Sequence, residues 1–185
     1  MTEITDTSKH APNAIDRFVL HWGDMGGQWG VNRSVAQIHA LLYLSERPLT
    51  ADEIADALGL ARSNISNSLK ELQAWNLVRR VPIRGDRREH FEAETDIWEM
   101  AMRIAAIRKE REINPAIATL RACVADAEGD TTVHPVAAKR LKEMLTFVDT
   151  MDRWFGQMMT VPRSKIVALI RLGTRIVSYL PLGKR

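Results

Sequence analysis

The stretch RSNISNSLKEL, residues 62–72, combines the hydrophobic spacing of a helix with an unusually polar remainder. Ile65, Leu69 and Leu72 recur at intervals of four and three residues, which places them on one helix face. Most other positions carry short hydrogen-bonding side chains, and Glu71 is the only acid. Solvated helix faces more usually carry glutamate and lysine. We therefore predict a helix that buries one face and presents the other to a polar partner.

The residues before this stretch predict a second, shorter helix. Thr50 and Glu53 have the spacing of a capping box, in which each side chain binds the backbone amide of the other residue. Gly59 suits the left-handed conformation that often ends a helix. Two helices joined by a turn of about three residues are typical of a helix-turn-helix.

Downstream, the hydrophobic period changes from helical to alternating. Residues 77–83 (LVRRVPI) and 89–93 (EHFEA) read as short strands. Gly85 and Asp86 are turn residues between them. The predicted fold is mainly α with a small β-hairpin: a winged helix-turn-helix domain plus N- and C-terminal dimerisation helices.

A helix-turn-helix followed by a basic hairpin indicates double-stranded DNA as the partner. Asparagine can pair with adenine, arginine with guanine, and serine with bases or phosphates in the major groove. Arginines at a hairpin tip suit phosphates or a narrow minor groove. The charge is placed accordingly, because residues 62–88 hold seven basic and two acidic side chains, although the whole chain carries only +3. The predicted DNA-binding residues are Arg62, Ser63, Asn64, Ser66, Asn67, Lys70, Arg84, Arg87 and Arg88.

The run from Pro48 to Met100 resembles the GbsR branch of MarR-type transcriptional regulators. Its distinctive pieces are N-I-S at 64–66, L-x-x-W-x-L-V at 72–78 and GDRRE at 85–89, and residues 27–45 are also similar. The resemblance implies an obligate homodimer that represses or activates genes, often genes for the osmoprotectants choline and glycine betaine. It further implies that a small effector releases the DNA. One departure is Ala61, which stands where the family usually has a capping serine; its loss costs about 1 kcal/mol unless Ser63 or the preceding turn compensates.

These elements predict four regions. Residues 1–12 form a flexible tail, 13–30 an N-terminal helix for dimerisation and effector binding, 31–94 the winged domain, and 95–185 a helical dimerisation region. The glycines within residues 22–30 are expected to end the first helix and form a hinge, and Pro115 is expected to kink or divide a later helix. The last helix, about 164–180, has an apolar face for a partner subunit or the N-terminal helix; the alternatives are a membrane surface or its own subunit. That face contains Ile166, Leu169, Ile170, Gly173, Val177 and Leu180.

Three aromatic residues near the glycines, Phe18, Trp22 and Trp29, are candidates for effector binding. Aromatic faces attract quaternary ammonium groups, although aromatic residues at helical spacing commonly belong to a core. Cys123 is a candidate oxidation sensor or, alternatively, a small buried apolar residue.

Other classes of function lack their motifs. The chain has no phosphate-binding loop, nucleophile elbow, CxxC motif or closely spaced histidine pair. We therefore expect neither an enzyme nor a metal or cofactor. The polar N-terminus and the absence of a run of about 20 apolar residues indicate a cytoplasmic protein without stable membrane association. The remaining alternative is a winged-helix module for protein assembly, which does not need a basic hairpin.

Overall fold

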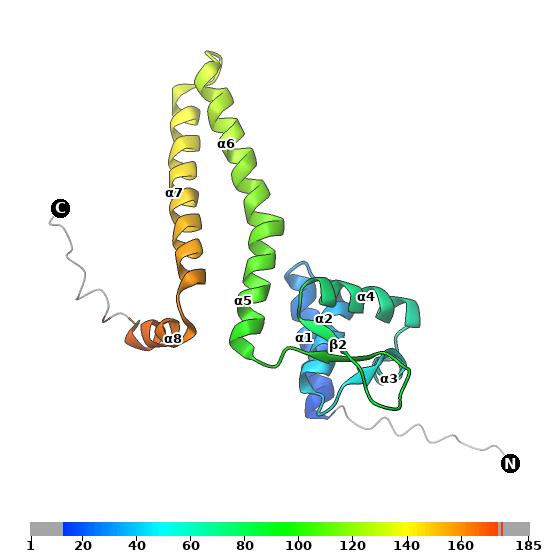
Figure 1. The fold of residues 1–185 in the computed structure, drawn as a ribbon. Helices are drawn as coiled ribbons and strands as arrows, with labels where there is room; N and C mark the ends of the chain where they lie inside the picture. Colours follow the sequence, from blue (N-terminus) through cyan, green and yellow to red (C-terminus); the bar gives the residue numbers. More distant parts are fainter. Residues whose placement is uncertain (1–12, 174, 176–185) are drawn as a thin grey trace. The chain divides into compact units, whose positions relative to one another are not determined.

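The computed structural model describes residues 13–173 and residue 175. The chain forms two compact units, Met1–Arg103 and Ile104–Arg185 (Figure 1). The first unit contains helices α1 (Ala14–Gln28), α2 (Arg33–Leu44), α3 (Ala51–Leu58) and α4 (Arg62–Ala74), strands β1 (Leu49–Thr50), β2 (Val78–Val81) and β3 (His90–Ala93), and the start of α5 (Ile97–Arg108). The second continues with a π-helical turn (Lys109–Ile113), α6 (Asn114–Gly129), α7 (Pro135–Thr160) and α8 (Arg163–Leu172). Within the described residues, no helix is both long enough and apolar enough to cross a membrane.

Helix α1 continues through the glycine-rich segment, so the predicted hinge there is wrong. Gly23 and Gly26 are buried within α1. A Cβ atom at Gly26 would lie 2.5 Å from Cβ of Ala36, and one at Gly23 would lie 2.5 Å from Cγ of Gln37. The glycines therefore allow α1 to approach α2 closely. The helix ends only at Trp29, before Gly30 takes a positive φ of 76°.

The capping box at the start of α3 is confirmed. Thr50 N–H donates to Glu53 Oε2 at 2.7 Å, and Glu53 N–H donates to Thr50 Oγ1 at 3.3 Å. Hydrogen bonds from Arg47 and then from Thr50 lower the pKa of Glu53 to about 2. Gly59 ends the helix with a φ of 62°, as its sequence position predicted.

Helix α4 packs its apolar face into the core of the first unit. Ile65, Leu69 and Leu72 are each at most 2% exposed, and Ile54 of α3 is fully buried. Ala61 occupies the N-cap position of α4, and within the described residues no side chain caps this helix. Ser63 therefore does not compensate for the missing serine.

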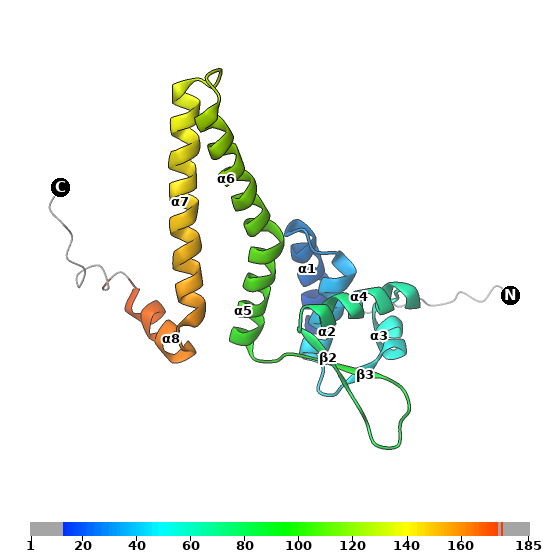
Figure 2. The ribbon, with the colours of Figure 1, turned by 45° about the horizontal axis from the view of Figure 1, so that its top comes forward.

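The predicted hairpin is confirmed, and it belongs to a three-stranded antiparallel sheet of order β1-β3-β2. β2 pairs with β3 from Val78 opposite Ala93 to Val81 opposite His90. β1 was not predicted from the sequence; it is only two residues long and pairs Leu49 with Phe91. The β2–β3 connection projects from the body of the unit (Figure 2). Two helices joined by a turn and followed by this hairpin form a winged helix-turn-helix.

Pro115 lies at the point where the later helical region is divided. It is the second residue of α6, and only Asn114 separates it from the π-helical turn. The amide of Asn114 bonds to the carbonyl of Lys109, five residues back rather than four. Because proline has no amide hydrogen to donate, a local change of helical period near it agrees with the prediction.

In the second unit, α6 and α7 lie side by side (Figures 1 and 2). Ion pairs connect them at 2.7–2.8 Å: Arg121 with Asp149 and Lys142 with Glu128. Cys123 on α6 is exposed, so the alternative of a buried apolar cysteine is wrong.

Helix α7 presents a large apolar face to solvent. Met144, Phe147, Met151 and Trp154 are 46–66% exposed. Their intervals of three, four and three residues place them on one face, as in a coiled-coil seam. Apolar faces of this kind usually mark an interface. The sequence analysis placed such a face on the last helix, where Ile170 is indeed 62% exposed; Val177 and Leu180 lie outside the described residues.

Candidate nucleic-acid interface

The polar face of α4 is open to solvent along its length. Arg62, Ser63, Ser66, Asn67 and Lys70 are all exposed, while the apolar residues between them face the core. The helix thus offers hydroxyl, amide and ammonium groups from one rigid element. These groups match hydrogen-bonding positions on base edges and phosphates.

Asn64 differs from its neighbours because its side chain is partly buried and engaged within the chain. Its Nδ2 donates to Ser34 Oγ at 2.9 Å, and its Oδ1 accepts from Ser68 Oγ at 3.3 Å. Ser34 lies in the first turn of α2, where Asn32 caps the helix. Asn64 therefore connects α4 to the start of α2, and a base contact by Asn64 requires this bond to be exchanged.

Arg62 is also held by an internal partner. Its guanidinium forms an ion pair with the carboxylate of Asp52 in the first turn of α3. The arginine side chain remains 71% exposed, so the pair is solvated and readily exchanged. The ion pair orients Arg62 at the start of α4 rather than removing it from the exposed face.

Asp86 and Arg88 shape the tip of the hairpin. Arg88 donates its backbone N–H to Asp86 Oδ1 at 2.9 Å, and its Nη2 lies 2.5 Å from Asp86 Oδ2. These hydrogen bonds from Arg88 hold the pKa of Asp86 well below its ordinary value. The ring of buried His90 lies behind them, with Nδ1 3.0 Å from the carbonyl oxygen of Arg88 and Nε2 3.5 Å from Asp86. Arg88 is thus part of the turn's own structure.

Arg84 and Arg87 are the two hairpin arginines for which the described residues provide no ion pair. Both side chains are exposed, on either side of Gly85 with its φ of 87°. By contrast, Arg79 pairs with Glu92 at 2.6 Å and Arg80 with Glu89 at 2.5 Å. The cationic groups most ready to meet a polyanion are therefore those of Arg84 and Arg87.

The candidate effector residues do not form a cage around one point. Phe18 and Trp22 stack with ring centroids 5.4 Å apart. Trp29 is 54% exposed and lies seven residues beyond Trp22, which corresponds to about 10 Å along a helix. The three rings thus line one side of α1 rather than surrounding a ligand.

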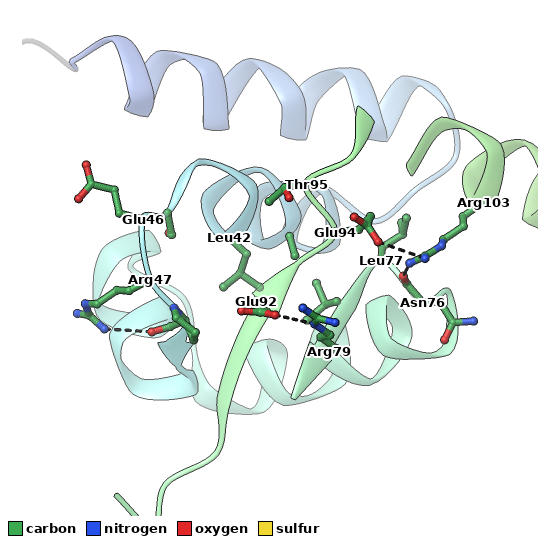
Figure 3. Close-up of a pocket in the computed structure, with 14 residues that line it drawn as sticks. Leu42, Glu46, Arg47, Asn76, Leu77, Arg79, Glu92, Glu94, Thr95 and Arg103 are labelled. Carbon is green, nitrogen blue, oxygen red and sulfur yellow. Dashed lines mark hydrogen bonds and ion pairs between the residues drawn. The ribbon is translucent and has the colours of Figure 1, made fainter. Parts of the chain in front are cut away.

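The described part of the chain was also compared with the requirements of a metal site and of a ligand cavity. No group of three or more histidine, cysteine, aspartate or glutamate side chains there is placed to hold a metal ion. A cavity of about 590 Å³ lies at the base of the hairpin (Figure 3). Its rim carries the ion pairs Arg79–Glu92 and Arg103–Glu94, and none of the predicted DNA-binding residues lines it.

Comparison with known proteins gives a match between residues 29–89 and the MarR family. The repressor GbsR of Bacillus subtilis (strain 168) is 27% identical over 100 residues, which cover 54% of this chain and 55% of GbsR. The putative regulator YvaV of the same strain is 23% identical over 86 residues, 46% of this chain and 49% of YvaV. The chain thus matches about half the length of these curated relatives, whose names describe transcriptional regulators and not enzymes. The crystal structure of a transcriptional regulator, 21% identical, covers 80% of this chain and 96% of its own with a TM-score of 0.55, which shows a shared fold.

Three residues that shape the interface were missed by the sequence analysis. Ser34 binds Asn64, Asp52 binds Arg62, and Asp86 binds Arg88. The turn position of Asp86, two residues before Arg88, was a usable local signal. No local signal marks the other two, because their partners lie 30 and 10 residues away along the chain.

Proposed function

We propose that this chain, whose residues 29–89 match the MarR family, is a DNA-binding transcriptional regulator of the GbsR type that acts in the cytoplasm. The observation that supports this most directly is the combination of an exposed polar face on α4 with two arginines, Arg84 and Arg87, that have no ion pair within the described residues. A winged-helix module used only for assembly has no need of that combination.

In the proposed complex, α4 enters the major groove and the hairpin meets the flanking backbone. Asn67 and Ser66 are exposed at the middle of α4 and face base edges, while Lys70 reaches a phosphate. Arg84 and Arg87 neutralise phosphates without first breaking an internal bond. Arg62 and Arg88 also contact phosphates, but each must first give up its ion pair, with Asp52 and Asp86 respectively; both pairs are solvated and cost little to break.

The sequence preference is tested by substituting Asn67. Loss of a bidentate base contact should cost about 1–3 kcal/mol at the preferred site and relax discrimination between bases. Asn67→Ala and wild type are compared in gel shifts with a duplex from the protein's own promoter region and with a scrambled duplex. If Asn67→Ala keeps the full difference in affinity between the two duplexes, Asn67 does not read bases.

We propose that the regulator is a homodimer, with the α7 face of Met144, Phe147, Met151 and Trp154 covered by a second copy. A single recognition helix reads only a few base pairs, and a dimer doubles the readout. Phe147 is 66% exposed in the isolated chain and lies within this face. Phe147→Glu is expected to give a monomer in sedimentation experiments, whereas Gln157→Glu, at an exposed polar position of the same helix, retains the dimer. A dimeric Phe147→Glu variant would place the subunit contact elsewhere.

The family resemblance also leads us to propose a repressor of osmoprotectant genes whose effector is a quaternary ammonium compound. The aromatic side chains of α1 are the candidate contacts. Phe18 and Trp22 stack on each other, and Trp29 lies about 10 Å further along the helix. Choline or glycine betaine should then quench tryptophan fluorescence and weaken DNA binding. If tryptophan fluorescence does not change up to millimolar concentrations of these compounds, they are not the effector. The proposal of DNA binding does not depend on this result.

A further inference from the structure

Helix α5 is attached to the first unit by few side chains, although it leads directly from that unit into the second. Of its twelve residues only Met100 is buried. Arg103 lies three residues further on and therefore on the same helix face, with a side chain that is 30% exposed. A buried apolar side chain and a guanidinium thus lie together on this face.

The guanidinium of Arg103 makes three contacts with different parts of the unit, and Figure 3 shows the two with Asn76 and Glu94. Its Nε donates to Glu99 Oε1 at 2.9 Å within α5, its Nη1 donates to the carbonyl oxygen of Asn76, and its Nη2 lies 3.2 Å from Glu94 Oε2. Asn76 comes directly after the last turn of α4 with a φ of 55°, and Glu94 directly follows β3. A single side chain therefore joins the ends of α4, β3 and α5.

The chemistry of this junction requires arginine. A guanidinium presents five donors in a fixed plane, whereas a lysine ammonium is a compact point charge that cannot span three separated acceptors. The contact with Asn76 also places a cation at the C-terminal end of α4, where the helix dipole favours it. The Arg103 side chain is 30% exposed, whereas the paired arginines of the hairpin are 53–79% exposed, so this ion pair is less screened by solvent.

We propose that Arg103 is a positioning residue, which fixes α5 to the recognition helix and to the base of the wing. This proposal rests on the proposed function as a dimeric DNA-binding regulator. Met100 is the one buried apolar residue of α5, and apolar contact is non-directional. With Arg103 in place, the two winged domains of a dimer are held so that they can bind both half-sites of the DNA at the same time. Without it, each winged domain still binds its own half-site, but the second contact loses the benefit of a high effective concentration.

The attachment itself is tested without DNA. Spin labels are placed at Ala57→Cys on α3 and Ala101→Cys on α5, in a Cys123→Ser background, since Cys123 is the only cysteine of the chain. The distance distribution between the labels should broaden in Arg103→Lys, which keeps the charge. Arg79→Lys is the matched control, because Arg79 lines the same cavity but pairs only with Glu92 across the hairpin. An unchanged width in Arg103→Lys overturns the proposal.

The consequence for DNA binding is tested with two duplexes, one containing the footprinted promoter site and one with half of that site scrambled. Arg103→Lys should bind the complete site about tenfold more weakly and the half-site within about twofold of wild type. Equal losses on both duplexes would show that Arg103 merely supports α4 locally, and no loss on either would show that it positions nothing; both results overturn the proposal. A wild-type chain that binds neither duplex refutes the proposed function instead, and the spin-label distances then decide alone whether Arg103 holds α5.

Discussion

Replacing Gly26 by alanine tests the close packing of α1 on α2. The added Cβ would lie 2.5 Å from Cβ of Ala36, whereas carbon atoms in favourable contact are about 3.5–4.0 Å apart. Cβ of Ala36 is fixed to the α2 backbone, so the two helices must separate. Overpacking of this kind costs about 1–3 kcal/mol, and the upper end applies because no side chain can rotate away. A gain of about 1 kcal/mol in helix propensity offsets part of it, which leaves a loss of about 2 kcal/mol.

Gly27→Ala is the matched control in the same helix. No atom lies within 4 Å of the Cβ position at Gly27, which is exposed. Here the gain in helix propensity acts alone, and we expect stabilisation by about 0.5–1 kcal/mol. The two neighbouring substitutions should therefore shift the urea midpoint, followed by circular dichroism at fixed protein concentration, in opposite directions. If Gly26→Ala proves as stable as wild type, the glycines are not required for helix approach and the reasoning fails.

Three further predictions concern single side chains. Burial lowers the pKa of His39 from 6.5 to about 4, so its neutral form is favoured in the folded state. The free energy of unfolding should therefore be highest above pH 6.5 and should fall by about 3 kcal/mol as the pH is lowered through 4. His39→Leu should remove this part of the pH dependence in urea titrations. An unchanged pH dependence would assign it to other groups. Asn64→Ala should lower the free energy of unfolding by about 1 kcal/mol, and adding Ser34→Ala should lower it little further. If the losses of the two single variants add in the double variant, the hydrogen bond between them is not supported. Cys123 should react with a thiol reagent in the native protein as fast as in the urea-unfolded chain, and protection would contradict its exposure.

The elements that the sequence predicted correctly are those that depend on near neighbours. The start of α3 depends on Thr50 and Glu53, three residues apart, and its end depends on Gly59 alone. The apolar face of α4 follows from Ile65, Leu69 and Leu72 within little more than two turns. The hairpin follows from alternation around one turn. In each case the side chains that determine the structure lie within one short window, so their spacing is sufficient.

The failed predictions involve contacts between distant parts of the chain. Gly23 and Gly26 suggest a helix end from their residue type alone. In the structure, their lack of a Cβ allows α1 to pack closely against α2, which begins several residues later. The role of Asn64 in reading bases stays a prediction, but its hydrogen bond with Ser34, 30 residues away, was not predicted. For Cys123, only the alternative of a buried residue was wrong, because residue type does not specify what covers a side chain. Side-chain spacing cannot predict such contacts because they depend on how the elements pack.

The sequence predicted the net charge of this region, but not which basic side chains form ion pairs within the chain. An excess of basic residues between 62 and 88 is evident in the sequence. The structure shows that Asp52 and Asp86 restrain Arg62 and Arg88. The number of arginines therefore overstates the number that are ready to bind an anion, and this changes which substitutions are informative.

The central claim is that α4 and the wing bind duplex DNA, and the salt dependence of binding tests it most directly. Fluorescence anisotropy with a labelled promoter duplex, repeated at increasing KCl, gives the slope of log affinity against log salt. Wild type should bind at low salt. Combining Arg84→Ala with Arg87→Ala removes two arginines from each subunit of the dimer, and therefore four phosphate contacts. The magnitude of the slope should then fall by about four, close to one for each contact. Arg17→Ala on α1 should leave the slope unchanged. Absence of wild-type binding at low salt, or an unchanged slope in the double variant, would contradict the account.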